Sequence, residues 1–125
     1  MSSPAPIDVA PILAHIEAAP GVGRLRSLPG GFAQADQETV DAVLREAARF
    51  CADHLAPLNA WGDRHGCSLE NGRVRVPPGY AAAWQTYADA GWPTLDHPVE
   101  LGGQGLPLFL AAAVQQLVDS SCAAF

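Results

Sequence analysis

The sequence contains no lysine, and its seven basic side chains are arginines scattered along 125 residues. Thirteen acidic residues outnumber them and give a formal net charge of −6. A surface that binds nucleic acid or acidic lipid needs clustered cations to neutralise phosphates. The charge balance therefore argues against a nucleic-acid-binding protein and against one that adheres to acidic membranes.

Cysteine is also scarce. Cys51, Cys67 and Cys122 make an odd number, which argues against a secreted disulfide framework. The first ten residues lack the basic residue that precedes the apolar part of a secretory signal. The longest apolar run, over residues 106–114, is too short to cross a bilayer. We therefore expect a cytoplasmic chain without a membrane span.

Hydrophobic residues make up 49% of the chain and charged residues only 16%, a low share of charge for a free-standing globule. This balance indicates either a surface that another protein part covers or an ordinary alanine-rich surface. The length suits one domain. We divide it into an N-terminal extension over residues 1–35, with one short helix, and a helical domain over residues 36–125.

Helical spacing of apolar residues predicts a first helix around residues 7–16, with Asp8 as a possible cap and Pro20-Gly21 at its end. Residues 21–31 are predicted to be a loop because of their glycines and Pro29. The strongest pattern predicts a helix over residues 36–56, capped by Asp36. Pro57 should stop that helix and leave residues 58–66 irregular.

Asn71-Gly72 lies between two short extended runs within residues 68–76, the pattern of a β-hairpin with a tight turn. A third helix is expected over residues 78–90, ended by Gly91, and a last one over residues 107–122. On the third helix, one side should carry Tyr80, Ala83, Trp84 and Tyr87. The sequence thus predicts an all-α fold with one small hairpin.

Several residue groups suggest chemistry without specifying a reaction. Cys51, His54, His65 and Cys67 could supply four zinc ligands, but their spacing fits no familiar module and favours a structural cysteine with surface histidines. No motif frames a serine as a nucleophile. We therefore predict neither a metal site nor a catalytic residue.

Two glycine-rich runs, over residues 21–23 and 102–105, lack the preceding strand of a dinucleotide fingerprint. They suit tight loops better, although the second precedes a helix and its N–H groups could face an anion. Trp84, Tyr87 and Trp92 could stack on a flavin or a nucleobase, but core packing is the commoner use of such residues.

Residues 91–107 read Gly-Trp-Pro-Thr-Leu-Asp-His-Pro-Val-Glu-Leu-Gly-Gly-Gln-Gly-Leu-Pro. This stretch resembles the Gly-Trp…Pro-Glu-x-Gly-Gly-Gln-Gly-Leu-Pro segment of acyl-CoA dehydrogenases, particularly the branch with an extended N-terminus that includes the methylthiopropanoyl-CoA dehydrogenase type. Shorter likenesses precede it in the same order, at residues 6–8, 50–59, 62–66 and 76–80.

The resemblance implies the N-terminal helical domain of an enzyme that also has a middle β-domain and a C-terminal helical bundle. In that family, FAD and the acyl thioester bind where the domains meet, a glutamate removes the α proton, and hydride passes to the flavin. The catalytic base and most flavin contacts lie beyond the region resembled. We therefore expect a chain that is inactive and binds FAD weakly alone, and that needs a partner carrying the other domains to meet acyl-CoA.

The family's helix after the glycine-rich loop (here Gly102, Gly103 and Gly105) often carries a Glu pair whose second member lies at the floor of the acyl pocket. The matching residues here are Gln115 and Gln116, so the resemblance makes Gln116, with Ser120 one turn beyond, the candidate pocket residues. Cys122 stands where the branch usually has Asn. The alternative function is a non-catalytic helical interaction module derived from the same fold.

Overall fold

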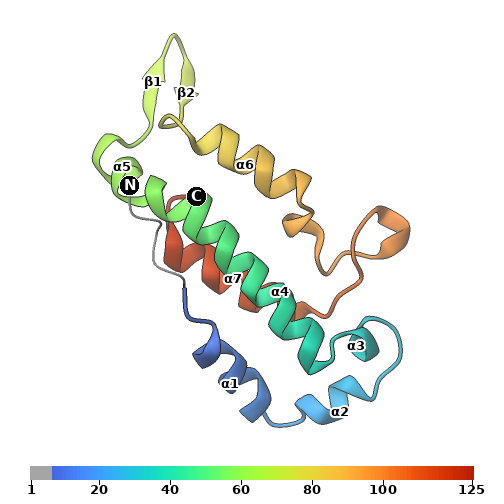
Figure 1. The fold of residues 1–125 in the computed structure, drawn as a ribbon. Helices are drawn as coiled ribbons and strands as arrows, with labels where there is room; N and C mark the ends of the chain where they lie inside the picture. Colours follow the sequence, from blue (N-terminus) through green and yellow to red (C-terminus); the bar gives the residue numbers. More distant parts are fainter. Residues whose placement is uncertain (1–6) are drawn as a thin grey trace.

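The computed structural model describes residues 7–125, so Pro6, part of the resemblance above, lies outside the described residues. Helices dominate, and one antiparallel hairpin accompanies them (Figure 1). This confirms the predicted fold class. The elements in chain order are α1 (Ala10–Ala18), α2 (Val22–Arg26), α3 (Gly31–Gln34), α4 (Gln37–Phe50), the π-helix η1 (Cys51–Leu55), α5 (Ala56–His65), β1 (Ser68–Glu70), β2 (Arg73–Arg75), α6 (Tyr80–Asp89), the 3₁₀-helices η2 (Trp92–Thr94) and η3 (Val99–Leu101), and α7 (Leu108–Ser121).

The core lies where α4 and η1 pack against α7, and the two long helices run side by side (Figure 1). Leu44 and Leu55 on one side and Leu110 and Leu117 on the other are fully buried. Burial of such a side chain stabilises the fold by about 1.5–3 kcal/mol. This seam fixes the position of α7.

The predicted cap of α4 is confirmed. The Thr39 backbone N–H donates to Asp36 Oδ1 over 2.8 Å, which satisfies one of the free donors at the helix start. The same hydrogen bond holds the pKa of Asp36 below its ordinary value. From this start, Val40, Leu44 and Ala47 face the core at helical spacing.

The prediction that Pro57 stops this helix, leaving residues 58–66 irregular, is wrong. The chain widens into the π-turn η1, where the Ala56 N–H bonds to the Cys51 carbonyl, five residues back. Helical structure then continues through α5 to His65, with Pro57 in its first turn. Proline is tolerated there because a first-turn residue needs no N–H donor.

Residues 21–31 were predicted to be a loop, and this is wrong in part, because α2 occupies residues 22–26 and α3 begins at Gly31, while residues 27–30 are a turn. The glycines mark the helix boundaries: Gly21 and Gly30, with φ of 88° and 75°, stand at the two N-caps. The first helix ends before Pro20-Gly21, as predicted. Asp8 lies one residue before the N-cap of α1 but accepts the Ala10 N–H over 2.9 Å.

The hairpin forms as predicted. Asn71 and Gly72 have φ of 52° and 74°, as a two-residue primed turn requires. Leu69 pairs with Val74 across the strands, and both side chains are exposed. The hairpin projects beyond the helices (Figure 1).

Helix α6 begins after Gly79 and ends before Gly91, close to its predicted bounds. Tyr80, Ala83 and Tyr87 are buried, but Trp84 is 52% exposed, so its predicted place on the buried side is only half right. Its ring lies 5.7 Å from Tyr87 at the edge of the core.

Tyr80 connects three helices. Its hydroxyl lies 3.3 Å from Cys122 Sγ and donates to the Leu58 carbonyl over 3.5 Å. The hydrogen bond with Cys122, aided by burial, raises the pKa of Tyr80 to about 12, so the phenol stays protonated at neutral pH. Gly62 of α5 approaches the same hydroxyl so closely that a Cβ would collide with it.

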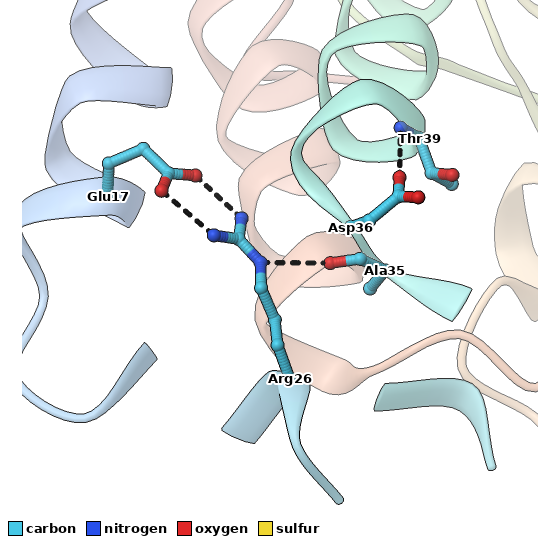
Figure 2. A network of polar contacts seen from close by, with 5 residues as sticks. All are labelled: Glu17, Arg26, Ala35, Asp36 and Thr39. Carbon is cyan, nitrogen blue, oxygen red and sulfur yellow. Dashed lines mark hydrogen bonds and ion pairs between the residues drawn. The ribbon is translucent and has the colours of Figure 1, made fainter. Parts of the chain in front are cut away.

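An ion pair ties the N-terminal helices together (Figure 2). Arg26 of α2 donates to both carboxylate oxygens of Glu17 in α1, over 2.8 and 2.6 Å. Its Nε also donates to the Ala35 carbonyl over 3.1 Å, just before α4 begins. This hydrogen bonding lowers the pKa of Glu17 below 4.5.

We predict that Glu17→Gln lowers the free energy of unfolding by roughly 1 kcal/mol at neutral pH, measured by urea denaturation. Because the folded-state pKa of Glu17 is depressed, its stabilisation is present above pH 4.5 and is lost as pH falls through the lowered pKa. The difference in free energy of unfolding between wild type and variant should therefore disappear at acidic pH.

Glu46→Gln is the control, because it breaks an exposed pair with Arg49 within one helix and should lower the free energy of unfolding by less than about 0.5 kcal/mol. Equal costs for the two variants would contradict the assignment.

We further predict that Gly62→Ala destabilises the protein by about 1–3 kcal/mol, since the methyl group collides with the Tyr80 hydroxyl. Tyr80→Phe should cost about 1 kcal/mol through its lost hydrogen bonds. The double variant should cost less than the sum, because removal of the hydroxyl makes room for the methyl group. Strictly additive costs in a double-mutant cycle would rule out this contact.

Candidate functional site

The segment between α6 and α7 is a tightly folded loop rather than an open one. Gly91, with φ of 79°, turns the chain out of α6, and η2 and η3 follow. The Gln104 side chain reaches back and donates from Nε2 to the Gly91 carbonyl over 3.1 Å. The two ends of the motif that carries the family resemblance therefore contact each other.

The backbone N–H groups of residues 102–106 all donate within this loop. The N–H of Gly103 bonds to the Pro98 carbonyl over 3.0 Å, and that of Gly105 to the His97 carbonyl over 2.9 Å. The N–H groups of Gly102, Gln104 and Leu106 donate to the carbonyls of Val99, Thr94 and Leu95. The interpretation of this run as an anion cradle is therefore wrong, because these donors are already engaged.

The backbone geometry of this loop explains why it contains glycine at three positions. A Cβ at Gly103 would collide with the His97 carbonyl oxygen. Gly102 and Gly105, with φ of 84° and 66°, adopt the left-handed conformation that other residues rarely occupy. The motif is thus a tight loop that sets the start of α7.

A groove of about 610 Å³ lies beside this loop. Phe50, Trp92 and Leu95 give it apolar walls, and Gln104 forms part of its lining. The His54 ring stacks on Phe50 with centroids 4.9 Å apart, while Glu46 and Arg49 pair with each other at the rim. The remaining lining residues are Ala42, Val43, Asp53, Thr86 and Ala90.

Sequence reasoning missed this groove. Phe50 lies within the helix predicted over residues 36–56, and Trp92 is one of the three aromatics proposed for stacking or for the core. Of the other two, Tyr87 is buried and Trp84 is half-exposed. The polar side chain of Gln104 between glycines was the available signal, but its contact with Gly91 spans thirteen residues and only folding creates it.

The predicted pocket residues Gln116 and Ser120 are exposed on α7 and are not among the lining residues of this groove. With Leu108 and Ala112 they form an exposed stripe at four-residue spacing along the helix. Ser120 Oγ donates to the Leu117 carbonyl over 3.1 Å. The stripe contains no charged residue and lies opposite the buried face of α7.

The side chains of the neighbouring row on α7 are engaged with each other. Gln115 Nε2 donates to Asp119 Oδ1 over 2.8 Å. The two glutamines at the positions where the resemblance predicts a Glu pair therefore have different surroundings, and Gln116 belongs to the uncharged stripe.

Buried thiols occupy the interior of the domain. Cys122, which departs from the family pattern, is buried beside Tyr80. Burial raises the pKa of the Cys51 thiol, although a hydrogen bond with Ser121 opposes this shift. A buried, protonated thiol is a poor nucleophile, so Cys51 packs as a small apolar side chain.

The four possible zinc ligands differ in their surroundings. Cys51 is buried, Cys67 is exposed, and His65 bonds through Nδ1 with the Trp61 carbonyl over 2.9 Å. Within the described part of the chain, no three histidine, cysteine or acidic side chains gather around a position suited to a metal ion. Among residues 7–125, no helix has the length and hydrophobicity needed to cross a bilayer.

Comparison with profiles of known protein families gives no match. The chain is, however, 37% identical over 126 aligned residues to 3-methylmercaptopropionyl-CoA dehydrogenase of Ruegeria pomeroyi, an alignment that covers all of this chain. It spans about a fifth, 21%, of that relative's length. The matched part is the relative's N-terminal region. This similarity identifies the chain as related, over its whole length, to the N-terminal domain of the acyl-CoA dehydrogenase family.

Proposed function

We propose that this chain is the N-terminal helical domain of an FAD-dependent acyl-CoA dehydrogenase and forms one wall of the cavity that holds the acyl group and the flavin. The whole enzyme would catalyse α,β-dehydrogenation of an acyl-CoA thioester. The observation that carries this proposal is the similarity of the entire chain to the N-terminal region of a much longer dehydrogenase.

The exposed stripe of α7 supports the proposal that this helix forms one wall of the acyl cavity. Its first member, Leu108, is 70% exposed, and the loop residues Val99 and Leu101 are 68% and 79% exposed. Such strongly exposed large apolar side chains are typical of a surface that another protein part covers. We assign the acyl-facing positions to Gln116 and Ser120.

An uncharged wall has a chemical consequence. Where the family often has a carboxylate, Gln116 presents an amide, which can donate and accept hydrogen bonds without a charge. An amide can lie beside a thioester's acyl chain at far lower desolvation cost than a carboxylate. The proposal therefore places an apolar or weakly polar acyl group against α7.

FAD would supply the hydride acceptor in such an enzyme, and we propose that this chain contributes little of the site that holds it. The amides of the glycine-rich loop bond within the loop, and Trp92 faces a groove rimmed by the Glu46–Arg49 pair. The flavin would then be held mainly by the other domains.

We accordingly predict that the chain alone does not retain FAD. After incubation with excess flavin and desalting, the protein should show no flavin absorbance. A stoichiometric yellow complex formed by this chain alone would contradict the proposal.

A chimera tests the proposed function directly. We would replace the matching 126 residues of the Ruegeria pomeroyi relative with this chain. The chimera should bind FAD and oxidise 3-methylmercaptopropionyl-CoA. Gln116→Lys in the chimera should lower kcat/KM by about tenfold or more, because the new ammonium group loses its hydration in the acyl cavity.

Gln115→Lys is the matched control, since Gln115 is the adjacent exposed glutamine but lies on the neighbouring row of α7. It should change kcat/KM by less than about twofold, as surface substitutions usually do. Equal effects of the two variants would remove Gln116 from the pocket. A chimera that binds no flavin would oppose the proposal and favour an interaction module.

A further inference from the structure

The segment between Val9 and Ala35 is fully buried only at its two ends. Val9 and Ala35 are buried, whereas every side chain of α1, α2 and α3 is exposed or half-buried. These helices have nine, five and four residues. Helices this short are unstable alone, so the segment keeps its structure only while it is docked.

The Arg26 side chain connects the helices of this segment to each other and to Ala35. Arg26 joins α2 to Glu17 of α1 through two hydrogen bonds and to the Ala35 carbonyl through a third (Figure 2). Asp36 is a further negative charge near the guanidinium. The closure therefore combines this polar network with partly buried contacts of Ile12, Leu13 and Ile16 with the core.

The segment also rests against the loop ahead of α7. Gly31, at the start of α3, lies so close to the Gly105 carbonyl that a Cβ would collide with its oxygen, and Leu106 Cα would be 3.5 Å away. The loop's own hydrogen bonds run to residues 94–99 and do not involve α3. The loop therefore keeps its internal support when α3 moves away.

We propose that residues 10–34 form a strap that opens as one unit between fixed ends at Val9 and Ala35, and that its opening uncovers Gly105 and Leu106 beside the start of α7. The Arg26–Glu17 ion pair keeps the strap closed, and the Gly31–Gly105 contact docks it on the loop. The seam of α4, η1 and α7 holds the largest fully buried side chains and stays intact when the strap opens. This inference does not depend on the proposed enzymatic function.

Hydrogen exchange of the whole chain, followed by mass spectrometry over a series of low urea concentrations, tests the strap. Amides such as those of Leu25 and Ala33, which donate within the strap, should exchange with a shallow urea dependence. Amides of α4 and α7 should exchange slowly, and their exchange rates should rise steeply with urea concentration, because only global unfolding exposes them. Glu17→Gln should accelerate strap exchange about fivefold.

Gly31→Ala and Gly23→Ala form a matched pair of helical glycines. A Cβ at Gly31 meets the loop backbone, whereas a Cβ at Gly23 has nothing within 4 Å. Gly31→Ala should accelerate strap exchange about tenfold or more while α4 and α7 keep their steep urea dependence. Gly23→Ala should slow strap exchange or leave it unchanged, since alanine favours helix.

Two outcomes would overturn the proposal. One is a single urea dependence shared by the strap and by α4 and α7 in the wild type. The other is equal behaviour of the two alanine variants. If Gly31→Ala abolishes folding altogether, the wild-type urea series and Glu17→Gln decide the question.

Discussion

The packing of α4 and η1 against α7 determines the rest of this structure. Because Leu44 and Leu55 pack with Leu110 and Leu117 in one seam, α7 can bury only one of its faces within the domain. The opposite stripe, from Leu108 to Ser120, is then necessarily exposed. The helix that supplies the proposed cavity wall is thus rigidly supported from behind, as a wall that positions a reacting group must be.

Close approach of backbone at glycine is the second constraint. Gly103 lies against the His97 carbonyl, Gly31 against the Gly105 carbonyl, and Gly62 against the Tyr80 hydroxyl. Each contact joins segments that any side chain would separate. The glycine-rich motif that resembles acyl-CoA dehydrogenases is accordingly a structural device in this chain: it folds the loop on itself and sets the angle at which α7 starts, while its N–H groups are consumed internally.

The domain combines two kinds of stabilisation. Its centre is apolar and rests on aliphatic side chains and buried thiols. Its N-terminal part adds to partly buried aliphatic contacts an arginine that bonds to Glu17 and Ala35. An apolar seam is insensitive to pH, whereas a carboxylate–guanidinium contact depends on ionisation. The two parts are therefore expected to differ in their response to acid.

The sequence by itself determined the elements whose signals are local. The spacing from Val40 to Leu44 and beyond, the Asp36 cap and the Asn71-Gly72 turn each depend on residues close in the chain, and each is present as predicted. The family relationship was also readable, because the order of short motifs is a property of the sequence alone. The assignment of Gln116 and Ser120 to an acyl pocket stays a prediction from that resemblance.

Tertiary structure decided what depends on contacts between distant residues. Pro57 did not end the helix, because a π-turn stabilised within the core shifts the hydrogen bonding just before it. Residues 22–26 and 31–34 form two short helices, in which Arg26 and Gly31 contact other segments of the chain. The Gln104 side chain donates a hydrogen bond to the Gly91 carbonyl, thirteen residues away. Local propensity carries no information about such partners, so only the folded chain could specify them.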